Sequence, residues 1–171
     1  MAHVPALGLS RVLLRLLRIL NLVGGAALVV AFILSFPLEP SFREFFSKQP
    51  PRIDPWLLIP TLRLWMLLAM PAIAAVHIQL TRLLEMVETV RAGDPFVPLN
   101  AVRMKTIARC MLAIQLLDLV YGIMAKTMTA AGSRIDWSFS ANGWLAVVLL
   151  YVLASVFEHG ARLRSDLEAM V

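Results

Sequence analysis

Residues 80–109 read LTRLLEMVETVRAGDPFVPLNAVRMKTIAR and form the one long polar interruption in a chain that is otherwise mostly apolar. The stretch separates two hydrophobic segments and contains five basic residues. Of the 171 residues, 60% are hydrophobic and 16% are charged, whereas soluble proteins average about 45–50% and about 25%. A soluble domain could not bury that much apolar surface, so the sequence predicts an integral membrane protein.

Four windows around this stretch are long and apolar enough for a helix to cross a hydrocarbon core of about 30 Å. We expect spans at about 19–36, 56–80, 106–125 and 137–157, with residues 81–105 as a polar hairpin between the second and the third. The fourth window is short unless it starts near Trp137. The predicted fold class is all-α, an integral membrane four-helix bundle with helical cytoplasmic extensions, and residues 1–171 form a single transmembrane domain.

The basic residues predict the orientation of these spans. With the N-terminus inside, the inner side holds ten of them (Arg11, Arg15, Arg18, Arg82, Arg91, Arg103, Lys105, Arg109, Arg162 and Arg164) and the outer side holds five (Arg43, Lys48, Arg52, Lys126 and Arg134). This asymmetry satisfies the positive-inside rule and places both termini in the cytoplasm. Anionic lipid explains the net charge of +5, so we expect no direct contact with nucleic acid.

Two amphipathic segments are predicted to extend the spans into the cytoplasm. Residues 81–92 alternate apolar and charged positions at helical spacing, and Gly93 suits the position just after the end of a helix. Asn100 is expected to cap the third helix, and Leu163, Leu167 and Val171 recur at four-residue intervals after the fourth span. The predicted partner-binding surface consists of Leu83, Val87, Arg91, Phe96, Leu163 and Leu167.

The hairpin RAGDPFVPLNAVRMKTIA and the ending VFEHGARLRSDLEAMV together resemble the bacterial four-helix membrane proteins of the domain-of-unknown-function 2975 family. The motifs that carry the resemblance are Gly93, Pro95, Phe96 and Asn100 in the hairpin, and Phe157, Gly160 and Leu163 with the acidic and hydrophobic residues that follow. Members of that family are often encoded near small helix-turn-helix regulators of the Cro/CI type. The resemblance implies a multi-pass protein of the bacterial inner membrane. It also implies a membrane partner for a DNA-binding protein, without an established enzymatic activity.

Among the polar residues inside the predicted spans, Arg63, Gln115 and Asp118 form the candidate intramembrane site. Because an ionised side chain at the centre of a membrane helix costs roughly 2.5–3.5 kcal/mol, each charged residue there marks a candidate site. One interpretation is a buried pair of Arg63 with Asp118 that fixes helix register. The alternatives are a polar-ligand or proton site at all three residues, and an Arg63 side chain that extends to the outer interface.

Two histidines, His77 and His159, are expected near the inner interface. They could ligate a haem, but a pH-sensitive contact of such a histidine with Glu158, or a plain interfacial position, is the favoured interpretation. Cys110 is the single cysteine, so an intrachain disulfide is excluded. No metal-binding spacing occurs in the sequence, so we expect neither a metal nor another cofactor.

Two classes of function remain. In the first, the chain senses a signal and holds a small DNA-binding regulator on its cytoplasmic face. In the second, it forms an oligomeric transporter or channel for protons or small solutes, which uses Gln115 and Asp118. No nucleophile elbow, phosphate-binding loop or paired carboxylates occur, so we expect no enzyme.

Overall fold

The computed structural model describes residues 4–48, 55–130 and 135–169. Within these ranges the chain is helical with short connections and has no strand. Four long helices, α1 (Val4–Leu34), α3 (Pro55–Arg91), α4 (Pro98–Ala130) and α5 (Ala141–Ala169), are joined by a short helix, α2 (Glu39–Ser47), and by loops. The expected all-α class is thus confirmed.

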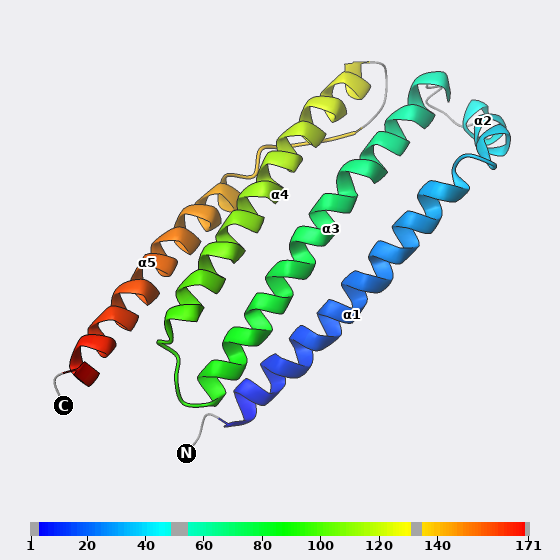
Figure 1. Cartoon of the computed structure of the whole chain (residues 1–171). Coiled ribbons are helices and arrows are strands. Elements are labelled where there is room, and N and C mark those ends of the chain that lie inside the picture. The colour runs from blue at the N-terminus through cyan, green and yellow to red at the C-terminus, as the bar shows by residue number, and fades with distance from the viewer. Residues whose placement is uncertain (1–3, 49–54, 131–134, 170–171) are drawn as a thin grey trace.

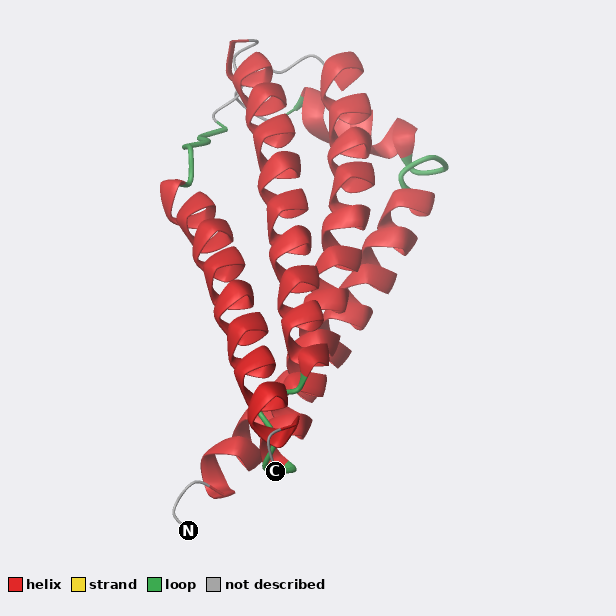
Figure 2. Cartoon of the chain, turned by 60° about the vertical axis from the view of Figure 1, so that its left-hand side comes forward, coloured by secondary structure: helices red, strands yellow, loops and turns green. Residues whose placement is uncertain are grey.

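The long helices form an open row in the order α1, α3, α4, α5, each antiparallel to its neighbour (Figure 1). Within the described ranges, α1 packs against neither α4 nor α5, and α3 does not reach α5. Figure 2, a view turned by 60°, shows the same order. The bundle expected from the sequence is therefore open, because its first and last helices do not meet. Both termini and the α3–α4 turn lie at one end of the row, here called the termini end, and α2 lies at the other, the α2 end.

Each of the four long helices has the length and hydropathy needed to cross a membrane. Their outward faces carry large apolar side chains, and none of the residues in the most apolar window of α1 is buried inside the protein. Such extended apolar surfaces are typical of proteins surrounded by lipid. The helices run further than the predicted spans at the termini end, because the amphipathic segments continue them.

The α3–α4 turn explains how the polar hairpin is closed. Gly93 has φ +87°. Its N–H donates to the carbonyl of Val90, and the N–H of Asp94 donates to the carbonyl of Thr89. These two hydrogen bonds form a Schellman motif, and Gly93 lies just after the end of the helix, as the sequence predicts. Asn100 is not the N-cap of the next helix: α4 begins at Pro98, which suits a first helical position because it has no N–H to satisfy.

The connection into α5 differs from the expected span at 137–157. Residues 135–140 are extended and run back along α4, and the helix begins only at Ala141 (Figure 1). The hydroxyl of Ser140 accepts a hydrogen bond from the N–H of Gly143 at 3.3 Å, which helps to start the helix there. The Trp137 ring fills the space over Gly122 of α4. Non-helical backbone beside a spanning helix is tolerated where it packs on protein in this way.

Candidate functional site

Arg63 does not pair with Asp118, so the predicted pair between α3 and α4 is wrong. Its guanidinium donates to Glu39 at 2.8 Å, to the Ser35 carbonyl at 2.6 Å and to the Ser35 hydroxyl at 3.1 Å. It also lies 4.2 Å from the centre of the Phe36 ring. Sequence reasoning missed Glu39 because it lies beyond the first span. The α1–α2 turn brings it back over the end of α3, and Arg63 thereby joins α3 to α2.

Gln115 of α4 is buried, with 6% of its surface exposed. Its amide lies against Gly143 in the first turn of α5, where a Cβ would come within 1.7 Å of Nε2. This nitrogen has no hydrogen-bond partner among the described residues. A buried amide without a partner costs free energy, so Gln115 is a polar locus at the point where α5 begins. Gln115 and Asp118 lie one turn apart on α4, whereas Arg63, the third residue of the predicted intramembrane site, lies on α3.

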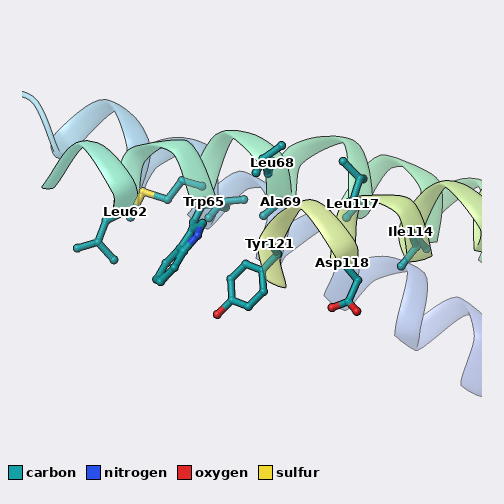
Figure 3. A pocket seen from close by; sticks show the side chains of 11 residues that line it. Leu62, Trp65, Leu68, Ala69, Ile114, Leu117, Asp118 and Tyr121 are labelled. Atoms are coloured by element: carbon teal, nitrogen blue, oxygen red, sulfur yellow. The ribbon is translucent and has the colours of Figure 1, made fainter. Parts of the chain in front are cut away.

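Asp118 lies one helical turn further along α4. One of its carboxylate oxygens accepts a long hydrogen bond of 3.4 Å from the indole N–H of Trp137. Within the described ranges, no basic group lies within 4.0 Å of this carboxylate. Asp118 also lines a hollow of about 490 Å³ between α1, α3 and α4. Figure 3 shows that Trp65 of α3 and Tyr121 of α4 point to the same side as Asp118.

The two histidines are on different surfaces. His77 lines a hollow between α1 and α3 together with Asn21 and Gly25, and its Nδ1 atom has no partner among the described residues. His159 is exposed on α5, and its Nδ1 atom lies 3.0 Å from the carbonyl oxygen of Ser155. The two side chains line separate hollows that share no residue. Among the described residues, Glu158 forms no hydrogen bond or ion pair with either histidine, and its partners are Lys105 and Arg162.

A network of side chains fixes the hairpin at the termini end. Asn100 is fully buried, with 0% exposed. Its amide donates to the Thr89 hydroxyl at 2.8 Å and to the Pro95 carbonyl at 2.9 Å, and its oxygen accepts from Arg103 at 2.9 Å. Arg103 also donates to Glu85 at 2.9 Å. Asn100 therefore joins α3, the turn and α4, a role that the expected cap position did not suggest.

Ion pairs extend this network to the other helices. Glu88 of α3 lies 3.3 Å from Arg11 of α1. Glu158 of α5 accepts from Lys105 of α4 at 2.8 Å and from Arg162 of its own helix at 2.9 Å. Every neighbouring pair in the row is thus bridged by charged side chains at the termini end.

The predicted partner-binding residues are not all available to a partner. Leu83 packs against a cluster of Met86, Met104, Ile107 and Ala154. Val87 is half-buried and Arg91 is exposed. Phe96 and Leu163 are exposed by 43% and 65% and line one hollow with His159 and Gly160. The Leu167 side chain lies outside the part of the chain whose side chains the structure describes.

A scan against protein-family models, a search of curated proteins and a search of solved structures each gave no match. The resemblance to the domain-of-unknown-function 2975 family therefore stays a prediction. Within the described ranges, no group of three or more His, Cys, Asp or Glu side chains has the geometry to hold a metal ion. The candidate sites are thus two: the Asp118 hollow, and the surface at the termini end around Phe96 and Leu163.

Proposed function

We propose that the chain is an integral protein of the bacterial inner membrane that holds a small helix-turn-helix regulator at its cytoplasmic end. In this proposal the termini end of the row lies in the cytoplasm, as the excess of arginine and lysine at that end favours. The four long apolar helices supply the membrane anchor. The family resemblance indicates that the partner is a small DNA-binding regulator.

The observation that carries the proposal is the junction between the α3–α4 turn and α5. Phe96 of the turn lies against Gly160, where a Cβ would come within 2.9 Å of its ring, and the Phe96 and Phe157 ring centres are 5.9 Å apart. Asp94 forms an ion pair with Arg164. Two segments distant in sequence are thereby held as one surface. A preorganised surface favours binding of a folded partner, because few side chains and loops lose conformational freedom on association.

The exposed groups of this surface indicate the chemistry of its partner. Phe96 and Leu163 border a hollow of about 420 Å³, and the exposed basic residues Arg91 and Arg162 lie on the two segments. An amphipathic helix could insert apolar side chains into such a hollow. Acidic side chains on that helix would complement the arginines. A regulator with one acidic amphipathic helix outside its DNA-reading helix fits this description.

The experiment is capture of the tagged chain from its native membrane in mild detergent, followed by mass spectrometry. The test variant is Leu163→Arg, because Leu163 is exposed and its replacement leaves the packed cluster around Leu83 intact. The matched control is Leu99→Arg, which makes the same change at a leucine that is 53% exposed and does not line the Leu163 hollow. We expect a small DNA-binding protein with wild type and Leu99→Arg, and its loss with Leu163→Arg. In direct binding measurements, the purified regulator should bind wild type and Leu99→Arg and should not bind Leu163→Arg. Recovery of only the same chain from all three would refute the proposal.

Transport by an oligomer is a second candidate, and it is favoured by the buried, unpartnered Gln115 amide and the Asp118 carboxylate beside it on α4. Polar groups inside spanning helices are typical of ion and solute paths. Flux into proteoliposomes would test it. Transport predicts flux that is lost in Asp118→Asn, with capture of the regulator unchanged. The regulator proposal instead predicts no flux, with capture of the regulator that is unchanged in Asp118→Asn and lost in Leu163→Arg.

A further inference from the structure

The open row of helices leaves a hollow over α3. Its walls come from α3 and α4, with Leu28 of α1 on the third side. Because α1 and α4 do not pack against each other, the hollow is open between them. Its volume of about 490 Å³ falls within the range of about 300–1,000 Å³ that is usual for small-molecule sites.

The lining combines one anionic group with two aromatic rings. Asp118 and Tyr121 project from neighbouring turns of α4, and Trp65 projects from α3 toward the same side (Figure 3). The Trp65 and Tyr121 ring centres are 5.0 Å apart and their planes are inclined by 42°. The remaining lining side chains, which come from α1, α3 and α4, are all apolar.

The charges around the hollow leave this carboxylate without a counter-ion among the described residues. Arg63, near the same end of α3, is engaged by Glu39 and the Ser35 carbonyl. Lys126, two turns beyond Asp118, lies 5.6 Å from the Trp137 ring centre. The Trp137 indole donates only a long hydrogen bond of 3.4 Å to Asp118. An ionised carboxylate in apolar surroundings is stabilised by a cation that enters beside it.

We propose that this hollow binds a lipophilic organic monocation, with its charge at the Asp118 carboxylate and its apolar groups against the Trp65 and Tyr121 rings. Aromatic faces attract organic cations, most strongly at tryptophan. A small hydrated metal ion would need several oxygen ligands, and the lining offers one carboxylate among apolar side chains. The open side between α1 and α4 faces the lipid in a spanning chain, so a ligand that partitions into the bilayer can reach the site.

This inference goes beyond the regulator and transport proposals, because it concerns binding alone. A chain that binds the cation and captures no regulator keeps the inference and loses the proposed function. A chain that captures the regulator and binds no cation keeps the proposed function and loses the inference.

The test is titration calorimetry of the purified full chain in a neutral maltoside detergent, with tetraphenylphosphonium as the probe. Tetraphenylborate is the matched control, because it has the same shape and the opposite charge. We expect saturable binding of the cation by wild type and none of the anion. Asp118→Asn should weaken cation binding by about tenfold or more, as loss of a buried charge partner does, and Trp65→Leu should weaken it by about fivefold.

Two further variants separate site-specific binding from other effects. Asp118→Glu keeps the charge and should retain most of the affinity, which guards against a loss caused by misfolding. Asp136→Asn removes an exposed carboxylate outside the hollow and should leave the affinity unchanged. Equal binding of the cation and the anion, no saturable binding, equal weakening by Asp118→Asn and Asp136→Asn, or loss of binding in a folded Asp118→Glu protein would each overturn the inference.

Discussion

The indole ring of Trp137 lies over Gly122 of α4 so closely that a Cβ on the glycine would come within 2.3 Å of the ring atom Cε2. The same indole donates to Asp118. Trp137 belongs to the extended segment before α5. This contact therefore holds the segment before the last helix against α4, and glycine is required because any side chain would occupy the space of the ring.

Gly122→Ala should displace the Trp137 ring and destabilise the protein by about 1–3 kcal/mol, the usual cost of overpacking. Thermal denaturation in detergent, followed by circular dichroism, measures the effect. The control is Gly24→Ala, because a Cβ there meets no atom within 4 Å. In a helix that change should be neutral or stabilising by up to about 1 kcal/mol. Equal melting temperatures of the two variants would contradict the assignment of Trp137 to this space.

Asn100→Ala should destabilise the protein more than its small change of size suggests. The substitution leaves the Thr89 hydroxyl, the Pro95 carbonyl and one Arg103 nitrogen without the hydrogen bonds that Asn100 supplies. Buried polar groups that lose partners cost about 1–3 kcal/mol. The matched control is Asn142→Ala, since Asn142 is exposed. Chemical denaturation should separate the two variants, and a cost for Asn100→Ala no larger than the control's would show that the network contributes little.

The sequence was sufficient to predict four long apolar helices and the glycine-terminated end of α3, because length, hydropathy and turn chemistry act locally. It was insufficient for Arg63, whose partner Glu39 is brought near by the α1–α2 turn, and for Asn100, whose hydrogen bonds depend on how α3 and α4 pack. The start of α5 was misplaced for the same kind of reason. A start near Trp137 gives the fourth span a membrane-crossing length, but in the structure the Trp137 ring packs over Gly122 and the helix begins only at Ala141. Which apolar side chains stay accessible, such as Leu163 rather than Leu83, is also decided by packing.

Lys105 and Glu158 should show a measurable coupling across the interface between α4 and α5. Their side chains are 39% and 36% exposed, so water screens the pair and the coupling should be small but above zero. A double-mutant cycle of Lys105→Met and Glu158→Gln measures it at low salt. The coupling should shrink at high salt, because exposed charges are screened. A coupling of zero at low salt would mean that the pair does not join the helices, and Arg162 would then be the main partner of Glu158.

The last prediction concerns acid stability and the link between Arg63 and Glu39. Hydrogen bonds from Arg43 and then from Arg63 lower the pKa of Glu39 below its ordinary value. A carboxyl group whose pKa is lower in the folded state stabilises that state fully above its unfolded pKa, about 4.3 for glutamate, and this contribution is lost as the pH falls through the folded pKa. Wild type should therefore be more stable than Glu39→Gln at neutral pH. The difference should narrow as the pH falls below about 4.3.

Melting temperatures of both proteins between neutral and acidic pH measure this effect. The control is Glu44→Gln. Glu44 pairs with Lys48, four residues further along the chain, and both side chains are 70% exposed. This control should change the pH dependence little, since exposed pairs contribute little to stability. Glu39, by contrast, joins α2 to α3 through Arg63. If Glu39→Gln followed the same pH profile as wild type, the Arg63 contact would not hold α2 against α3.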